Sequence, residues 1–446
     1  MRILISALLA SALLPLAAAK VPADQAARLG HELTPLGAEK AGNAAGTIPE
    51  WTGGLTKPPA GYNVGDHHPD PYPDDKILFT ITAADIPKYA DQLSEGQKAL
   101  LKTYPDWKMN VYPTRRSAAV PQRIYDATIA NATRAELTNN GIGVTDAFVG
   151  IPFPIPANGL EAVWNHELRY RGDHVQRVRG QAAVHEDGSF TLVKFTDKFD
   201  GVYSRADENG DRDYTLFRIK QEISTPANLA GTIVLVHETT NVLEAPRRTW
   251  IFSPKDKRVR RVGEYAYDDP STAADGLATV DQFDMYSGTP DRYEWKLLGK
   301  KEMFIPYNAY KLHSDKITYN DIVRPGHINP DLARYELHRV WVVEGTLKLG
   351  TSHVYSKRVL YLDEDSWQAM VVDLYDEDGK LWRVSEAHGL NYYEVPLQWD
   401  TLEVFHDLKD KRYLVSGLDN QESMYNFKAQ IPDSEFTAGS VRRQGK

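Results

Sequence analysis

Residues 354–385, VYSKRVLYLDEDSWQAMVVDLYDEDGKLWRVS, decide which fold the sequence predicts. They contain three runs rich in β-branched, aromatic and other apolar residues, separated by two acidic turn sequences. Short apolar runs bounded by Asp and Gly are typical of antiparallel strands joined by tight turns. The stretch therefore predicts a three-stranded meander. Apolar–polar alternation is imperfect at 357–361, which indicates that some strands are covered on both faces. The runs and the turns between them are residues 354–362, 367–374, 381–385, 363–366 and 376–379.

Further hairpins are expected earlier in the chain. Their turns are HEDG at 185–188, whose Asp-Gly pair favours a tight hairpin, and SPKD at 253–256. No sequence period repeats along the chain, which argues against a propeller or a solenoid. From residue 146 onward the sequence therefore predicts one large antiparallel sheet. The strands flanking these two turns are residues 175–183, 189–194, 249–252 and 258–262.

A few short helices are expected before the sheet. Ser94 and Gln97 form a capping-box pattern, and the helix that they predict runs to Tyr104. A second helical pattern begins at Pro121 and is expected to end at the Asn-Asn-Gly sequence at 139–141. Helices followed by many hairpins predict the α+β class. A strongly curved sheet of this kind has a concave face that helices or a ligand must fill.

The N-terminal region has two compositional segments. Residues 1–19 combine Arg2, an apolar run and small residues up to Ala19, the pattern of a secretory signal peptide cleaved near Ala19. An uncleaved interfacial helix is the alternative. The dense Gly and Pro content that follows forbids regular helix and predicts an extended arm. The expected organisation is a signal peptide at 1–19, the arm at 20–80, short helices packed on the sheet at 81–145, a sheet body at 146–418 and a tail at 419–446.

Composition excludes several functions. The 446-residue chain has a formal net charge of -9, which argues against nucleic acid because that polyanion requires a basic face. The chain has no cysteine, so a disulfide scaffold, a thiolate metal site and a bacterial lipoprotein anchor are all excluded. At 42% hydrophobic residues the chain can bury a substantial core. We therefore expect an exported, periplasmic protein that is not a lipoprotein.

The usual catalytic signatures are missing. The sequence has no G-x-S-x-G, no phosphate-binding loop and no G-x-G-x-x-G. Three His-Glu pairs, which begin at His166, His185 and His237, lack the second histidine of a zincin and are interpreted as strand or turn residues. We predict no catalytic residue and no cofactor, although a hydrolase that uses His166 stays a less favoured alternative.

Two groups of residues resemble metal ligands by type alone. Asp66, His67, His68 and Asp70 lie in the Pro-rich arm, where nothing in the sequence fixes a ligand geometry, and are interpreted as a solvated loop. Residues 207–213 resemble the start of a calcium loop, but the twelfth position is an arginine, so an acidic turn is the simpler interpretation. We predict no metal site.

Aromatic and basic residues supply the candidate binding site. Nine Trp, 24 Tyr and 13 Phe make up 10% of the chain, and many lie in or beside expected strands. They can form ordinary core packing, or line a concave face that takes a hydrophobic ligand. Five arginines surround the hairpin at 249–262 and can contact a head group or an acidic partner. The candidate cavity residues are Phe153, Trp164, Trp250, Trp295, Tyr310 and Trp341, and the candidate head-group or partner contacts are Arg247 and Arg248.

Seven sequence blocks resemble a known family. They are LTPLGAEK at 33–40, TIPEWTGG at 47–54, PFPIP at 152–156, NGLEAVWNH at 158–166, DRYEWK at 291–296, YNAYKL at 307–312 and RYELHRVW at 334–341. Together they resemble the proteobacterial exported family of unknown function that is often labelled outer-membrane lipoprotein-sorting-like, over nearly the whole mature chain. The resemblance implies an open, incomplete antiparallel barrel with helices lidding its mouth. It also implies an association with efflux-type inner-membrane transporters and an outer-membrane partner, and it supplies no catalytic residue.

Three functions are therefore considered. The first is a periplasmic carrier for a lipid or other hydrophobic molecule, because exposing an acyl chain to water costs about 0.8 kcal/mol per CH₂. In that case the helices of residues 82–139 are expected to gate the cavity. The second is a non-catalytic adaptor that docks on an inner-membrane transporter or an outer-membrane protein. The third is the hydrolase.

Overall fold

The computed structural model describes residues 21–205, 213–262 and 267–445. The signal peptide expected at 1–19 and nearly all of the acidic loop expected at 207–213 lie outside these residues. Within the described part, no helix is both long and apolar enough to cross a membrane.

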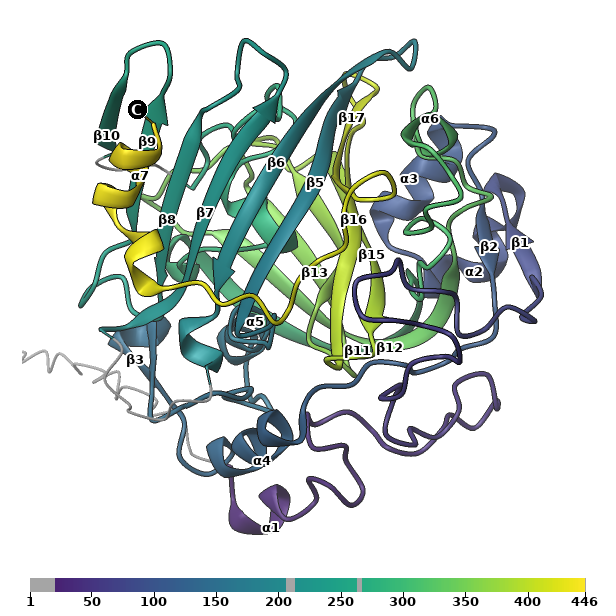
Figure 1. The fold of residues 1–446 in the computed structure, drawn as a ribbon. Coiled ribbons are helices and arrows are strands. Elements are labelled where there is room, and N and C mark those ends of the chain that lie inside the picture. Colours follow the sequence, from purple (N-terminus) through teal and green to yellow (C-terminus); the bar gives the residue numbers. More distant parts are fainter. Residues whose placement is uncertain (1–20, 206–212, 263–266, 446) are drawn as a thin grey trace, which may run out of the picture.

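A single fifteen-stranded sheet dominates the structure, and the α+β class is confirmed (Figure 1). Consecutive strands β5 to β10 form one antiparallel meander, β11 to β17 form a second, and antiparallel pairing of β17 with β5 joins them. The short strands β1 and β2 attach to β12 through one parallel pairing, between Val111 and Tyr335. The strands are β1 Phe79–Ile81, β2 Met109–Val111, β5 His174–Val184, β6 Phe190–Asp200, β7 Thr215–Thr225, β8 Ile233–Thr239, β9 Arg248–Ser253, β10 Arg258–Val262, β11 Tyr293–Pro306, β12 Tyr335–Leu347, β13 Lys357–Asp363, β14 Ala369–Tyr375, β15 Leu381–Tyr392, β16 Leu397–Asp407 and β17 Arg412–Leu418.

The helices are short and surround this sheet. The α-helices are α1 Ala23–Ala26, α2 Ile86–Tyr89, α3 Glu95–Thr103, α4 Gln122–Asn131, α5 Gly159–Glu167, α6 Tyr319–Ile322 and α7 Ala438–Gln444. The single-turn 3₁₀ segments are η1 Ala83–Asp85, η2 Ala90–Gln92, η3 Asn139–Gly141, η4 Val202–Ser204, η5 Val280–Met285, η6 Pro290–Arg292 and η7 Asp433–Phe436.

The sheet is not closed into a barrel, and because of this the chain must cross it once, between β10 and β11. β10 and β11 follow each other in sequence but lie at opposite ends of the strand order. The connection between them must therefore pass from one edge of the curved sheet to the other. We call its described part, residues 267–292, the crossing segment.

The expected hairpins are confirmed. The meander of 354–385 forms β13, β14 and β15, and the hairpins at 185–188 and 253–256 join β5 to β6 and β9 to β10. Nearly every residue of β13 to β16 is buried, as the imperfect alternation at 357–361 indicated. These strands therefore have covers on both faces.

α3 lies on the outer face of the sheet, which corrects the expectation that this region gates the concave mouth. Its Leu100 packs in one cluster with Val384 of β15. The next residue, Ser385, accepts a hydrogen bond from Gln282 of the crossing segment at 3.5 Å. Successive strand residues point to opposite faces. The crossing segment therefore covers the inner face of β15, and α3 covers the outer one.

The second expected helix is shorter than predicted. α4 ends at Asn131, and the residues that follow form a small hairpin of β3, Glu136–Thr138, with β4, Gly143–Thr145. The Asn-Asn-Gly sequence is the turn of this hairpin, with a φ of 58° at Asn140 and 88° at Gly141. Residues that tolerate positive φ favour a tight hairpin turn as much as a helix end, so the sequence signal was assigned to the wrong element.

α5 lies where only strands were expected. His166 belongs to this helix, so its assignment to a strand or turn was wrong, and Trp164, expected in or beside a strand, lies in the helix as well. Asn158 caps the helix by accepting a hydrogen bond from the Glu161 backbone N–H at 3.0 Å. All nine residues of α5 are buried or nearly so. A helix buried on every side lacks the one-sided apolar pattern by which helices are recognised.

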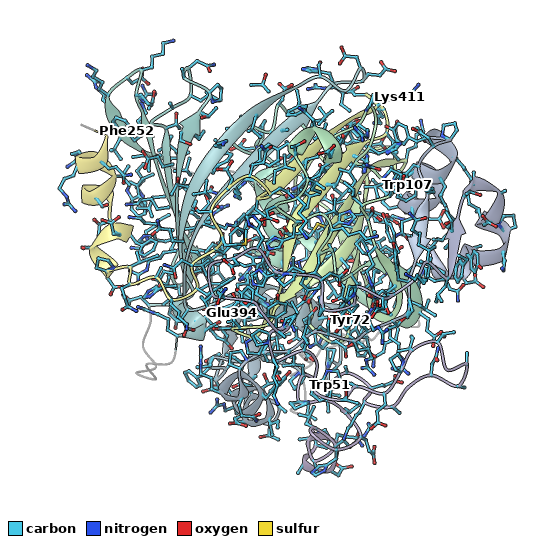
Figure 2. The ribbon with its side chains drawn as sticks, turned by 45° about the vertical axis from the view of Figure 1, so that its right-hand side comes forward. Trp51, Tyr72, Trp107, Phe252, Glu394 and Lys411 are labelled. Carbon is cyan, nitrogen blue, oxygen red and sulfur yellow. The ribbon has the colours of Figure 1, made fainter. Side chains whose placement is uncertain are left out.

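The N-terminal residues contact the body at several points. Leu36 O accepts a hydrogen bond from Trp367 Nε1 at 2.8 Å, and Leu55 N donates to Ser117 O at 2.8 Å. Arg116 is 4% exposed and bonds Asp365 through Nε at 2.9 Å and Nη2 at 2.7 Å. The same guanidinium donates to three backbone carbonyls of the N-terminal segment, those of Glu39, Lys40 and Pro49. Figure 2 shows Trp51 and Tyr72, from the same region, at the end of the body that holds Glu394.

Arg116→Lys is expected to lower the free energy of unfolding by about 2–3 kcal/mol, because lysine cannot form the two-pronged bond to Asp365 and serve three carbonyls as well. Urea denaturation measures the loss, and limited proteolysis should cut residues 39–49 faster. The matched control is Arg115→Lys, whose side chain is 42% exposed and whose partner Asp75 keeps its ion pair with Arg334. Equal stability of the two variants would contradict this role.

Candidate functional site

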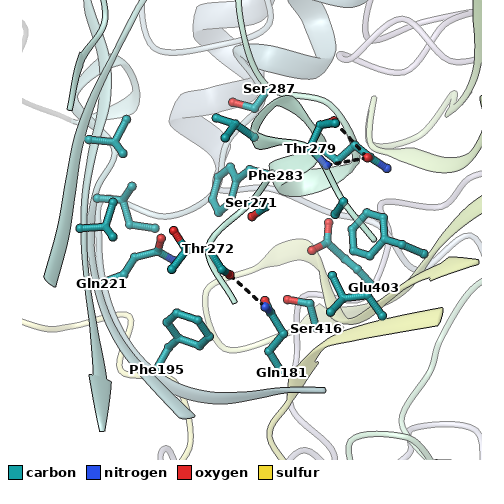
Figure 3. Close-up of a pocket in the computed structure, with 18 of the residues that line it drawn as sticks. Gln181, Phe195, Gln221, Ser271, Thr272, Thr279, Phe283, Ser287, Glu403 and Ser416 are labelled. Carbon is teal, nitrogen blue, oxygen red and sulfur yellow. Dashed lines mark hydrogen bonds between the residues drawn. The ribbon is translucent and has the colours of Figure 1, made fainter. Parts of the chain in front are cut away.

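A pocket lies on the concave face between the two meanders and beneath the crossing segment (Figure 3). Its cavity volume is about 90 Å³. Gln181 Nε2 donates to Thr272 O at 3.2 Å, which ties β5 to the crossing segment at the pocket. The lining consists of Arg179, Gln181, Phe195, Phe217, Ile219, Gln221, Val234, Val236, Arg247, Ser271, Thr272, Ala278, Thr279, Val280, Gln282, Phe283, Ser287, Glu403, Phe405, Leu414 and Ser416.

The N-terminal meander supplies an apolar wall to the pocket. Phe217 and Ile219 on β7, with Val234 and Val236 on β8, line it. Each pair is separated by one residue, so both members point to the same face of the strand. From the crossing segment, Phe283 packs against Phe217 with ring centroids 5.9 Å apart. Such a wall suits an apolar group.

Arg247 places a positive charge at this pocket. Its Nε lies 3.1 Å from Glu238 Oε2, and its guanidinium lies over the Tyr267 ring at 5.4 Å. Its Nη1 is buried and has no hydrogen-bond partner among the described residues. Burial raises the pKa of Glu238, and Arg247 opposes that rise. A buried donor without a partner is costly, so this N–H is available to an anionic group.

Three carboxyl groups lie beside the pocket. Oxygen atoms of Asp284, Asp400 and Glu403 all lie within 4.8 Å of one another. Burial, with its carboxylate neighbours, raises the pKa of Glu403 well above its ordinary value and that of Asp400 to about 6. For Asp284 the effect of burial is outweighed by Arg169 and Arg171, which lower its pKa. The charges of the three carboxyl groups are therefore neutralised by bound protons and by the two arginines. A metal ion would have to displace these to bind here.

α5 and the residues after it anchor the crossing segment. Arg171 Nη1 donates to Asp284 Oδ2 at 2.6 Å, and Arg169 Nη2 donates to Asp284 Oδ1. His166 Nε2 lies 3.0 Å from Tyr286 O, and its Nδ1 accepts from Ala369 N at 3.1 Å. Burial lowers the pKa of His166 to about 3. Both ring nitrogens are occupied, so the geometry gives no support to a hydrolase that uses this histidine.

The expected cavity aromatics are distributed over three clusters of the core. Phe153, Trp164 and Tyr310 pack in one, Trp295 and Trp341 in a second, and Trp250 borders a third. None of the six lines the pocket of Figure 3, and their role in ligand binding stays a prediction. Of the two expected head-group residues, Arg247 lines the pocket and Arg248 is exposed outside it.

His68 does not lie in a solvated loop, which corrects that interpretation. It is 3% exposed, with Nδ1 3.0 Å from His313 Nε2 and Nε2 2.8 Å from Glu394 Oε2. Among the described residues a second group of metal-ligand type combines His338, Asp363 and Asp365. Arg116 already binds both oxygens of Asp365, as described above. The side chains of both groups are therefore already engaged in ion pairs and hydrogen bonds within the protein.

Sequence reasoning missed most of the pocket. The alternation of Phe217 with Ile219 and of Val234 with Val236 is a strand signal that could have identified the apolar wall. Asp284 carries no comparable local signal, because its contact with Arg169 spans 115 residues. That contact follows only from the topology of the open sheet.

Comparison with known proteins identifies the family. A profile described as Protein of unknown function (DUF1329) matches residues 80–442. The chain belongs to the DUF1329 family. Another protein, Uncharacterized protein PA3922 of Pseudomonas aeruginosa, is 49% identical over 430 residues, covering 96% of this chain and 94% of that protein.

Three solved structures are similar at low sequence identity. A domain from Vibrio parahaemolyticus, provisionally described as an outer membrane lipoprotein-sorting protein domain, is 14% identical with a TM-score of 0.44, covering 64% of this chain and 98% of that one. A DUF1329 protein from Desulfovibrio piger is 13% identical with a TM-score of 0.42, covering 61% and 92%. A LolA superfamily protein from Nitrosomonas europaea is 14% identical with a TM-score of 0.38, covering 64% and 100%.

Glu403→Gln is expected to flatten the pH dependence of stability. Because the folded-state pKa of Glu403 is raised, the native chain holds a proton that the unfolded chain releases above its ordinary pKa. The stabilisation that this bound proton gives the native state is fully present below the ordinary glutamate pKa. It falls by about 1.4 kcal/mol per pH unit as the pH rises from there toward the raised pKa of Glu403 in the folded chain. Glutamine still accepts the Met285 N–H, bonded here at 2.9 Å, but cannot ionise.

Urea denaturation at pH 5.5 and pH 7.5 measures this effect. The wild type should lose stability between the two, and Glu403→Gln should lose less. Glu377→Gln, in the exposed turn between β14 and β15, is the control and should behave as the wild type. An unchanged slope in Glu403→Gln would show that Glu403 is ionised in the native state.

Proposed function

We propose that this protein is a periplasmic binding or carrier protein for a hydrophobic molecule with an anionic head group, working with an envelope transport system. The observation that carries the proposal is the juxtaposition of the apolar wall of β7 and β8 with the buried Nη1 of Arg247, which has no hydrogen-bond partner among the described residues. An apolar pocket with few convergent polar groups is the usual form of a small-molecule site. No catalytic role is assigned to any residue.

Ligand entry requires the crossing segment to move. The cavity of about 90 Å³ is smaller than the roughly 300–1,000 Å³ of pockets that enclose drug-sized ligands. Its roof is formed by Ser271, Thr272 and residues 278–287 of the crossing segment. Residues 281–285 are anchored by buried ion pairs. Residues 274–278 are held by core packing and by a hydrogen bond from Arg383 Nη2 to Gly276 O at 2.7 Å. Among the described residues, Thr272 is joined to the sheet by the hydrogen bond from Gln181 alone. We therefore infer that residues 271–273 move outward on binding.

Export to the periplasm belongs to the same proposal and rests on the signal-peptide pattern of residues 1–19. Cooperation with an efflux-type inner-membrane transporter or an outer-membrane protein rests on the sequence resemblance. Native mass spectrometry of the mature chain purified from membrane-containing cells tests the carrier function directly. A reproducible bound mass that extracts into organic solvent is expected. A clean apo mass, unchanged after incubation with host lipids, would favour the adaptor alternative.

Arg247→Gln is expected to weaken binding of an anionic apolar ligand by about tenfold or more, because it removes one charge-assisted hydrogen bond. The ligands are 1-anilinonaphthalene-8-sulfonate and the uncharged N-phenyl-1-naphthylamine, which differ by the sulfonate. Fluorescence titration should show the loss for the sulfonate only. Arg248→Gln is the matched control and should bind both ligands as the wild type does. Equal loss for both ligands would mean that Arg247 supports the pocket without contacting the anion.

A disulfide across the roof of the pocket is expected to abolish binding. The chain has no cysteine, so Gln181→Cys combined with Thr272→Cys introduces a single pair at two residues already joined by a hydrogen bond. The oxidised protein should fail to bind either dye, and reduction should restore binding. Mass spectrometry confirms the oxidation state. Full binding by the oxidised protein would show that ligands enter without this movement.

A further inference from the structure

A second feature of the molecule is a basic surface at the β10 end of the sheet. Five exposed cations lie in the turn of the β9–β10 hairpin and on β10, and α7, which packs beside this hairpin, adds Arg442 and Arg443 (Figure 1). Phe252 of β9 packs with Val441 of α7 beneath them, so the two elements form one surface. We call these seven side chains the basic hairpin patch. The five on the hairpin are Lys255, Lys257, Arg258, Arg260 and Arg261.

Among the described residues, the charges of this patch are almost uncompensated. Arg260 pairs with Asp256 at 3.0 Å. Within the described part of the chain, the other six cations have no ion pair. Elsewhere arginines are used differently: Arg116, Arg169 and Arg171 are all buried against carboxylates. A chain with a formal net charge of -9 therefore concentrates unpaired positive charge at one end.

A surface groove runs through the patch. It lies between the hairpin and the C-terminal end of α7, with a volume of about 710 Å³. Lys257, Arg258 and Arg442 line it, together with Glu222, which bonds Gln444. Three cations converging on one open groove present a shape that admits small anionic groups.

The patch lacks the features of a specific protein interface. Energetically important interface residues are usually aromatic or apolar anchors packed at the centre of the contact. The apolar residues here, Phe252 and Val259, form the floor of the groove and pack against α7; Phe252 is 5% exposed and Val259 is partly buried, so neither protrudes as an anchor. Long cationic side chains without an apolar anchor suit a fluid anionic surface, where each contributes about 1 kcal/mol through attraction to the surface potential.

We propose that the basic hairpin patch docks the protein on an anionic phospholipid bilayer. Docking is peripheral and electrostatic, and it is independent of the pocket because Arg247 is not part of the patch. It brings the β9–β10 edge of the sheet to the membrane surface.

Flotation of the full mature chain with vesicles tests this proposal. Vesicles of phosphatidylcholine with 30 mol% phosphatidylglycerol should bind the protein, vesicles of phosphatidylcholine alone should not, and 0.5 M NaCl should release it. The triple variant R258Q/R260Q/R261Q should weaken the partition by about 100-fold, since each cation is worth about fivefold.

A second triple variant, K76Q/K102Q/K411Q, makes the same change in net charge at exposed lysines outside the patch and should bind as the wild type does. Near-UV circular dichroism checks that both variants fold. Equal weakening of vesicle binding in both variants would show that binding depends on the net charge of the chain and not on the patch, and would overturn the proposal. Failure of the wild type to bind anionic vesicles at low salt would also overturn it, and would leave an acidic protein as the occupant of the patch.

Discussion

The structure depends on one topological constraint: an open, curved sheet whose two edge strands are consecutive in the chain. Because β10 and β11 lie at opposite edges, the connection between them crosses the sheet. A crossing buried against the concave face must satisfy its own polar groups. It does so through Asp284, which two arginines from the end of α5 bind, and through Asp281, which Arg358 of β13 binds at 2.9 Å. These buried ion pairs fix the central part of the crossing segment between the two meanders.

The same constraint determines what the concave face can bind. α5 and the anchored part of the crossing segment fill the half of the concavity formed by the C-terminal meander, where Trp295, Trp341 and Trp367 gather. The half formed by β6, β7 and β8 holds the pocket, whose roof includes both anchored residues near Asp281 and Asp284 and the segment around Thr272. The concave side of the sheet, where a ligand would lie, is thus occupied largely by the protein's own chain. Any carrier function consists of exchanging part of that chain for the ligand.

Local signals predicted the strands well and the interior poorly. The Asp-rich turns of β13–β15 and the Ser94 capping box are specified by neighbours in sequence, and both are observed. α5 was missed because burial on every side removes its amphipathic period. The aromatic residues were recognised as important, but composition does not say into which cluster a strand side chain points. Arg247 was identified because a group of arginines is rare in an acidic chain, whereas its partner surface on β7 and β8 depends on strand register.

A chain of buried hydrogen bonds shows how closely the N-terminal segment is joined to the body. Glu394, His68, His313 and Asp419 are linked by contacts of 2.8, 3.0 and 2.8 Å. Each contact needs one hydrogen, but two neutral imidazoles carry two N–H groups between them. A third proton would supply the missing hydrogen, but it would also place a positive charge in a buried site, and the cost of burying that charge is the larger effect. Burial lowers the pKa of His68, although the hydrogen bond to Glu394 opposes this effect. The unfolded chain therefore binds the proton more readily than the native chain, and acidification weakens this attachment as the pH falls below the ordinary histidine pKa.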